Sequence, residues 1–378
     1  MKVVLAHTQK PPSEARIFDK LAYSLSFFSN LKLYIFGGNN FGKDDFAYEI
    51  VLLPIFSTRR NLIYRLFNIW NCWCHLYKIK PDVVIVCSPD LLVPAVVYKV
   101  VYSKMLIFDI QENFGLNLKF QKSYRRLSWI NLQQITGLYF SWFYPFVDRF
   151  WLAEKIYEDQ LVLTKGSSLV FENRVSEKWR SKSAYNFIGP SGEDIVFLFS
   201  GVITVDSGIL RAIDFYYAFQ NRIPKARLII SGYIPNHILK SKIQNLAKQN
   251  KGIEILNEGK WVSSLNMWDL YKKTDVVFIS YVETEANNGK VATKFFEAQF
   301  AGKPVLCQKN GSFSKSIIAS HAGFEVDYHN PDCNDFIGLN DKILSFQPKN
   351  RFGLDFVFDA QGLRADFLNF CKRFSLEY

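Results

Sequence analysis

Short apolar runs alternate along this chain with longer segments whose apolar residues recur at helical spacing. In the first half, this pattern predicts strands at 2–6, 31–36, 50–53, 83–87 and 105–108, and helices at 13–28, 60–78 and 91–101. The strands are apolar throughout, which is typical of a parallel sheet covered by helices on both faces. Such sheets bind ligands at the carboxyl ends of their strands, so we expect functional residues in the loops that follow them.

A polar segment rich in Gly, Pro and Ser interrupts the alternation near residue 180. We therefore expect a first domain at 1–182, a linker at 183–192 and a second domain at 193–357. The second domain repeats the pattern, with strands predicted at 195–199, 226–230, 253–256 and 276–280 and helices at 208–219, 236–249 and 263–272. A final helix is expected at 359–374.

The stretch 281–307 has the most informative pattern: a polar loop, a helix, a turn at Gly302 and a strand. Because a helix N-terminus presents unpaired N–H groups, a loop that leads into one is suited to phosphate. Lys294 and Glu297 lie three residues apart, hence on one face of that helix. A cation can contact a diphosphate and a carboxylate can accept hydrogen bonds from ribose hydroxyls, which together suit a nucleotide sugar. The alternative is an ordinary solvated face.

Charge and composition narrow the class of partner. The chain has 46 Lys and Arg against 35 Asp and Glu, a net charge of +11, which favours phosphate-bearing substrates, anionic membranes or nucleic acid. Nucleic acid is disfavoured because no nucleic-acid motif accompanies the charge. We expect no metal site: Cys72 and Cys74 have the wrong spacing for a zinc knuckle. Six cysteines without a dense framework, and no apolar stretch long enough for a signal peptide or membrane span, predict a cytoplasmic location.

Residues 114–145 combine basic and aromatic side chains, including Lys119, Lys122, Arg125, Arg126, Trp129 and Trp142. The aromatic helix at 64–77 has a similar character. One interpretation is a surface that rests on anionic lipid at the inner face of the cell membrane. The other is that the aromatic residues fill the core of a large helical insertion.

Several motifs resemble those of family 4 glycosyltransferases. The string from Lys294 to Ala298, followed by Ala301 to Val305, is similar to their carboxy-terminal donor motif, and 13–17 and 108–113 resemble two junctions of their amino-terminal domain. The resemblance implies a GT-B fold: two Rossmann-like α/β domains whose parallel sheets face a central cleft. It also implies that the final helix, within 358–378, crosses back to the first domain.

The same resemblance implies the site. Lys294 and Glu297 are expected to be the catalytic pair, and Lys260 and Trp261 to contact the base. The other expected donor-binding residues are Gly201, Val202, Gly232, Asn287, Asn288, Gly289, Lys290 and Thr293. Arg16, Asp109 and Glu112 are expected on the acceptor side.

The chain departs from the family pattern at three places. The segment 200–208 lacks the usual Arg and Lys, Gly289 replaces the first glutamate of the donor motif, and Gln111 stands where His is common. Positive charge must therefore come from Lys294, with Lys290 as the competing assignment. Asn287 and Asn288 would then hold the donor sugar hydroxyls.

The resemblance implies a retaining, metal-independent hexosyltransferase without a cofactor. Its expected donor is a UDP-sugar, and its expected acceptor is a lipid-linked glycan intermediate of bacterial polysaccharide assembly. The alternative is a catalytically silent GT-B subunit that keeps the nucleotide site and acts as a partner in a glycosyltransferase complex.

Overall fold

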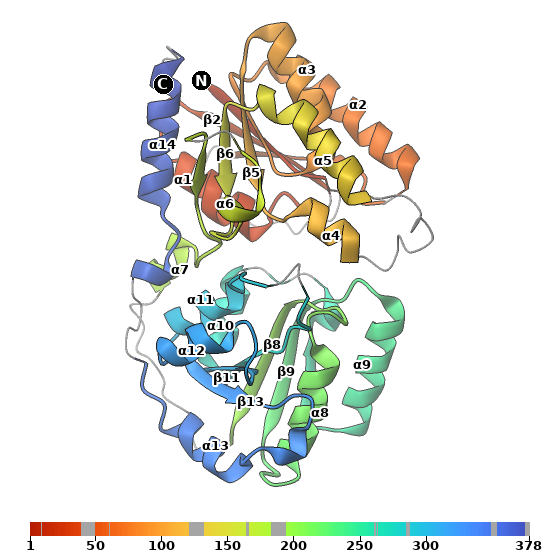
Figure 1. Cartoon of the computed structure of the whole chain (residues 1–378), viewed down its shortest axis with the longest axis vertical. Helices are drawn as coiled ribbons and strands as arrows, with labels where there is room; N and C mark the ends of the chain where they lie inside the picture. Colours follow the sequence, from red (N-terminus) through yellow and green to blue (C-terminus); the bar gives the residue numbers. More distant parts are fainter. Residues whose placement is uncertain are drawn as a thin grey trace. The chain divides into compact units, whose positions relative to one another are not determined.

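The chain folds into two α/β units (Figure 1). One comprises Met1–Asn173 and Phe358–Tyr378, and the other Arg174–Val357. The structure is a computed structural model and describes residues 1–8, 10–38, 50–59, 61–120, 132–163, 166–182, 194–260, 262, 264–284, 288–348 and 354–374. The first unit ends at Asn173 and not at the expected residue 182, and the expected linker at 183–192 lies outside the described residues.

The first unit contains a seven-stranded parallel sheet in the order β3-β2-β1-β4-β5-β6-β7. Its strands are β1 (Lys2–Ala6), β2 (Lys32–Gly38), β3 (Ile50–Phe56), β4 (Val83–Val86), β5 (Met105–Ile110), β6 (Arg149–Leu152) and β7 (Ser168–Val170). Its helices are the π-helix η1 (Arg16–Ala22), α1 (Tyr23–Leu25), α2 (Leu62–Ile79), the 3₁₀ helix η2 (Pro89–Leu91), α3 (Leu92–Tyr102), α4 (Phe114–Phe120), α5 (Leu132–Phe143), the 3₁₀ helix η4 (Tyr144–Phe146), α6 (Tyr157–Gln160) and α14 (Ala360–Arg373).

Alternate residues of each central strand enter different cores because side chains alternate across a strand. Val3 and Leu5 pack with η1, α1 and α14, whereas Val4 and Ala6 pack with α2, α3 and α5. Helices therefore cover both faces of the sheet, as predicted from its uniformly apolar strands (Figure 1). Part of the aromatic segment is core, since Phe140 is buried against Phe108, while Trp142 is 75% exposed.

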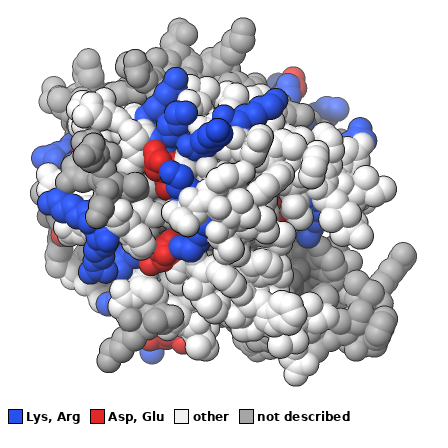
Figure 2. Space-filling view, turned by 90° about the horizontal axis from the view of Figure 1, so that it is seen from above, with Lys and Arg blue, Asp and Glu red and all other residues white. Residues whose placement is uncertain are grey.

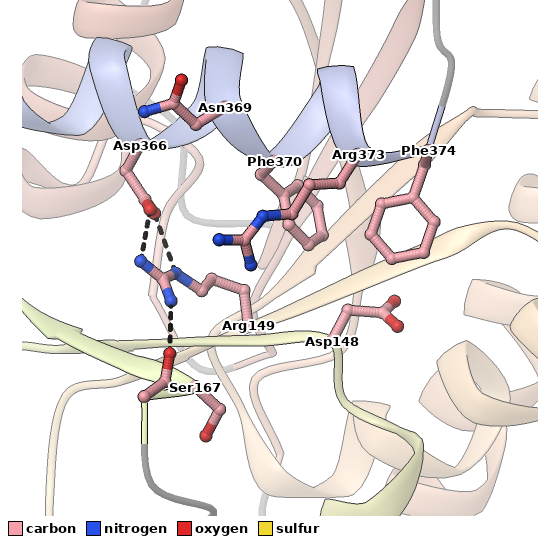
Figure 3. A pocket seen from close by; sticks show the side chains of 9 residues that line it. Asp148, Arg149, Ser167, Asp366, Asn369, Phe370, Arg373 and Phe374 are labelled. Carbon is pink, nitrogen blue, oxygen red and sulfur yellow. Dashed lines mark hydrogen bonds and ion pairs between the residues drawn. The ribbon is translucent and has the colours of Figure 1, made fainter.

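An ion pair fixes α14 to this unit (Figure 3). Asp366 accepts hydrogen bonds from Arg149 Nε at 3.1 Å and from Trp151 Nε1 at 2.9 Å. A hollow of 380 Å³ lies beside the pair, and Arg373 contributes to its lining. Because Arg149 opens β6, this hollow is at the amino end of the strand, opposite the edge where parallel sheets bind ligands.

The second unit contains a six-stranded parallel sheet in the order β10-β9-β8-β11-β12-β13. Its strands are β8 (Val196–Val202), β9 (Arg227–Tyr233), β10 (Ile253–Leu256), β11 (Val276–Ile279), β12 (Val305–Gln308) and β13 (Gly323–Val326). Its helices are α7 (Glu177–Lys182), α8 (Ile209–Gln220), α9 (His237–Gln249), α10 (Ser264–Lys272), α11 (Thr293–Phe300), α12 (Ser314–Ala319) and α13 (Phe336–Leu344), with 3₁₀ turns η5 (Asn257–Gly259), η6 (Pro331–Cys333) and η7 (Leu354–Phe356).

The strand order places a switch point between β8 and β11. The chain passes from β8 to β9 on one side and returns to β11 on the other. Loops that leave neighbouring strands in opposite directions open a crevice at their carboxyl ends, where open α/β sheets bind ligands. We therefore expect a ligand-binding site at the residues that follow Ser200 and Ser280.

Candidate functional site

The carboxyl ends of β8 and β9 are held close together by two glycines. Gly201 and Gly232 are partners in the register, with φ angles of +100° and +149°. A Cβ atom at position 232 would collide with the Gly201 carbonyl oxygen. Val202, one residue further, is 46% exposed. The glycines expected at the donor site thus form a bare stretch of backbone at the strand ends.

The loop after β8 leads into α8 through a compact turn. Thr204 N donates to Ser207 Oγ at 2.9 Å, and Ser207 N donates to Thr204 Oγ1 at 3.1 Å. Gly208 precedes α8 with φ +79° and lies directly against the Ser280 carbonyl, where a Cβ would collide. Ser280 Oγ donates to Gly208 O at 3.1 Å. The backbone and the hydroxyl group of Ser280 thus hold the start of α8 against the end of β11.

Lys294 brings a positive charge to the Gly201 backbone. It is the second residue of α11, after Thr293, and its side chain is half-buried. A Cβ on Gly201 would lie 2.6 Å from Lys294 Cε and closer still to Nζ. The ammonium therefore occupies the space that any larger residue at 201 would fill. The sequence places Lys294 near a helix start, and the structure adds its contact with β8.

The surroundings of Lys294 favour its charged form. Burial lowers the pKa of this ammonium, but nearby Tyr281 and Glu297, together with a hydrogen bond to the Tyr281 side chain, outweigh burial and raise the pKa above its ordinary value. Lys294 is consequently a cation at neutral pH. A cation beside bare backbone can meet a phosphate oxygen.

Glu297 is oriented by Tyr271, which the sequence did not single out. Tyr271 Oη, from α10, donates to Glu297 Oε2 at 2.8 Å. Burial raises the pKa of Tyr271 well above its ordinary value, and the Glu297 carboxylate raises it further, so the phenol stays protonated and remains the donor. In the sequence Tyr271 is one apolar position of an amphipathic helix. No local motif distinguishes it from a core residue.

The loop before α11 is described in part. Asn288 N donates to Thr284 O at 3.0 Å, and Gly289 has φ +76°. Lys290 is partly exposed, four residues before Lys294. Two expected donor-binding residues, Trp261 and Asn287, lie outside the described residues.

Glu283 is a second carboxylate beside this loop that the sequence did not suggest. Its Oε1 accepts from Ser312 N at 2.7 Å, just before α12. That hydrogen bond ties the loop after β11 to the loop after β12. Glu283 therefore anchors the start of the expected donor loop.

Lys260, expected near the base, follows a turn with positive φ at Asn257 and Glu258. Its ammonium pairs with Glu258 Oε2 at 3.2 Å, and both side chains are about three-quarters exposed. The lysine is therefore at the surface, and its ion pair among the described residues is screened by solvent.

The residues expected on the acceptor side have two different environments. Arg16 and Asp109 are no more than 1% exposed and bind each other, with Arg16 Nε donating to Asp109 Oδ2 at 2.9 Å. Arg16 Nη1 also donates to Phe171 O at 2.8 Å. The pair joins η1, β5 and the segment after β7, which is a structural arrangement. Glu112 is exposed and accepts from Asn117 Nδ2 at 2.7 Å.

Gln111, which replaces the family's usual His, belongs to a polar network. Its Nε2 donates to Asp109 Oδ2 at 3.0 Å, and its Oε1 accepts from Lys10 Nζ at 2.9 Å. Lys10 also pairs with Glu14 at 3.0 Å. Buried His7 lies among these charges, and burial lowers its pKa to about 4, with Lys10 adding to the effect and Glu14 opposing it. His7 is therefore neutral at physiological pH.

Comparisons with known proteins bear on the family and the fold. Residues 182–348 match the family described as Glycosyl transferases group 1. No curated protein sequence matches the chain.

Solved structures match over nearly the whole length. The sucrose-phosphate synthase of Thermosynechococcus elongatus has a TM-score of 0.65 and 10% identity, with 99% of each chain covered. HepE of Anabaena, in complex with UDP-glucose, has a TM-score of 0.62 and 14% identity over 99% of this chain and 100% of that one. A putative UDP-N-acetylglucosamine 2-epimerase of Listeria monocytogenes has a TM-score of 0.57 and 13% identity, with 99% of this chain and 96% of that chain covered.

At such low identities the structural matches establish the fold, and the family match adds the class of the domain. The predicted fold is confirmed: both parallel sheets are present, and the structural neighbours have the GT-B architecture. The resemblance to family 4 glycosyltransferases is likewise confirmed for the second unit, which carries a glycosyl transferase group 1 domain in a chain with the GT-B fold.

Proposed function

We propose that this protein is a retaining glycosyltransferase that takes its sugar from a UDP-sugar. The observation that carries the proposal is the arrangement of Lys294 against the Gly201 backbone with Glu297 one helical turn further along α11. HepE, with a similar fold, was solved with UDP-glucose, which supports the choice of nucleotide.

The diphosphate of the donor would lie at the ends of β8 and β9. Because Gly201 has no side chain, the Lys294 ammonium lies directly against its backbone and supplies the positive charge that the loop 202–208 lacks. The N-terminus of α11 adds the positive end of a helix dipole. Together these groups would stabilise the leaving diphosphate, the role a metal ion takes in other transferases.

The ribose would be held by Glu297. Tyr271 donates to Oε2 of this carboxylate, and a carboxylate can accept several hydrogen bonds at once. Both ribose hydroxyls can therefore donate to the same group. Lys260 and Trp261 are the residues proposed for the base.

The chemistry needs no protein base on the reacting face. In the retaining mechanism that the family resemblance implies, the bond from the anomeric carbon to the diphosphate breaks. The acceptor oxygen bonds the same face of that carbon, and the departing phosphate oxygen takes the acceptor proton. The residues of this chain would bind and neutralise the donor. The acceptor proposed is a lipid-linked glycan intermediate, and the sugar proposed is a hexose.

A panel of nucleotide sugars tests the proposal. Hydrolysis or transfer that releases UDP from one donor, and that is lost in Glu297→Ala while thermal unfolding is unchanged, would support it. Tight UDP binding without release from any donor would favour the silent-subunit alternative. Conversion of UDP-N-acetylglucosamine to its 2-epimer would contradict transfer, since an epimerase shares this fold.

A further inference from the structure

The outward side of α2 is apolar. Leu62, Ile63, Leu66, Phe67 and Trp70 are each more than half exposed, and they recur at helical spacing. Its buried positions include a polar one, Asn68. A surface helix of a globular protein normally has the reverse arrangement, with its apolar stripe toward the core. The outward stripe is therefore suited to contact something other than water.

Two neighbouring helices continue this stripe. On α3, Val97, Val100 and Val101 are exposed. Tyr102 of α3 packs on Tyr77 of α2, with 6.5 Å between the centroids of the two rings. α5 lies beside α3 (Figure 1) and exposes apolar side chains too, Trp142 most of all. Of the 23 exposed large apolar side chains among the described residues, thirteen lie on α2, α3 and α5. We call these outward sides the α2–α3–α5 face. Such a concentration marks an interaction surface.

The charges of this region have one sign. The segments 62–79, 92–102 and 132–143 contain no Asp or Glu. Arg59 precedes α2, and Lys78 and Lys80 end it; both lysines are exposed, and neither has an ion pair among the described contacts. Figure 2 shows a broad uncharged area with Lys and Arg side chains, and a few Asp and Glu side chains among them, along part of its border. Basic groups that border apolar and aromatic side chains complement an anionic bilayer.

We propose that the α2–α3–α5 face docks this protein on an anionic lipid bilayer. The apolar side chains would enter the region of headgroups and upper acyl chains, and the basic residues at the ends of α2 would contact lipid phosphates. The amino end of α2 follows β3, so the docked face would lie beside the carboxyl edge of the first sheet. That edge is where a parallel sheet binds its ligand, and a lipid-linked substrate would reach it from the bilayer.

This face overlaps the surface expected at 114–145 and the aromatic helix expected at 64–77, since α5 carries Trp142 and α2 spans Leu62–Ile79, and it adds the exposed side of α3. Lys122, Arg125 and Arg126 lie outside the described residues, as does the side chain of Lys119. The docking proposal does not depend on the proposed transfer reaction.

Sedimentation of the whole protein with phosphatidylcholine vesicles, with and without phosphatidylglycerol, tests the proposal. The wild type should bind the vesicles with phosphatidylglycerol more tightly. Leu66→Ser combined with Trp70→Ser and Trp142→Ser should lower the partition coefficient at least about tenfold. Ile238→Ser, on α9 of the other unit, is the matched control, since Ile238 is 83% exposed. It should bind like the wild type.

The charge is tested separately. Lys78→Ser with Lys80→Ser should lower binding to phosphatidylglycerol vesicles by roughly fivefold per lysine and leave binding to phosphatidylcholine almost unchanged. Brominated lipids should quench tryptophan fluorescence of the wild type, and Trp70→Phe with Trp142→Phe should remove most of that quenching. Every substitution is at an exposed position, so unchanged thermal unfolding is expected.

Two results would overturn the proposal. One is vesicle binding that is equal in the wild type and the triple serine variant. The other is a wild type that ignores vesicles but self-associates in light scattering, with the triple variant monomeric, because the face would then be a protein interface.

Discussion

Tyr271 of α10 and Glu297 of α11 are joined by a 2.8 Å hydrogen bond in which the phenol donates to the carboxylate. Tyr271 is fully buried, whereas Glu297 is half-buried. A buried donor thus fixes the orientation of a partly exposed carboxylate.

Tyr271→Phe should therefore weaken UDP binding and leave the fold intact. A hydrogen bond to a charged group contributes about 1.5–3 kcal/mol. Without it the Glu297 carboxylate is free to move and must be ordered when UDP binds, which costs part of that energy. We therefore expect a loss of about three- to thirtyfold in UDP affinity. Isothermal titration calorimetry measures it. Affinity equal to wild type would show that Tyr271 does not position Glu297.

Much of the fold could be predicted because its signals are local. The uniformly apolar strands and the helical spacing between them predicted the main elements within 2–108 and 195–280, with ends within a few residues, but gave no bounds for the helices and strands from α4 to α7. The first helix is an exception in its form, since it begins as the π-helix Arg16–Ala22, all of whose residues are buried. Its geometry depends on packing against the sheet and on the Arg16–Asp109 pair, which no local pattern reveals.

The candidate site was predictable only in part. Lys294 and Glu297 stand in a recognisable string, so sequence could select them. The contact of Lys294 with Gly201 joins residues 93 positions apart, and Tyr271 looks like a core residue of its helix. Such pairings arise from the strand order at the β8–β11 switch point. The same limit applied to Arg16 and Asp109, whose burial in one ion pair could not be read from their separate motifs.

Gly201→Ala should displace the Lys294 side chain from its contact with the Gly201 backbone. The new methyl group would occupy the space of the Lys294 side chain, in a backbone conformation of φ +100° that L residues rarely adopt. A loss of about 1–3 kcal/mol in unfolding free energy is expected, with at least about tenfold weaker UDP binding. Gly137→Ala on α5 is the control, because nothing lies within 4 Å of its Cβ position. That variant should bind UDP normally and be as stable as the wild type or slightly more stable.

Lys294→Ala should weaken donor binding and slow transfer together. Its ammonium is the described cation at Gly201, and its raised pKa keeps it charged, so donor affinity of the wild type should not fall between pH 7 and pH 9 through this group. Steady-state kinetics with Lys290→Ala alongside provides the comparison. If Lys290→Ala lost as much or more while Lys294→Ala stayed near wild type, the two roles would be reversed.

The first unit should lose stability in acid through His7. Its pKa in the folded protein is about 4, below the ordinary 6.5, so between these values the unfolded chain binds more protons than the folded one. The stabilisation is complete above pH 6.5 and declines as pH falls toward 4, by up to about 3 kcal/mol.

Glu14 acts in the same direction at lower pH. Burial alone would raise its pKa, but Lys10 and His7 lower it to about 2 from 4.5.

Urea denaturation at a series of pH values tests the His7 contribution. His7→Gln should flatten the curve between pH 6.5 and 4, while His237→Gln, at an exposed histidine, should leave its slope unchanged. Identical slopes for all three proteins would rule out His7 as the source.

The central claim is that Glu297 binds the ribose of the donor, and calorimetry with UDP and 2′-deoxy-UDP tests it most directly. Wild type should bind UDP about ten- to several-hundredfold more tightly than Glu297→Ala does, since each hydrogen bond to the carboxylate contributes about 1.5–3 kcal/mol. It should also lose affinity for the deoxy nucleotide, whereas Glu297→Ala should barely distinguish the two. A folded Glu297→Ala protein that binds UDP fully, or that still prefers the ribose form as strongly as wild type does, would contradict the account.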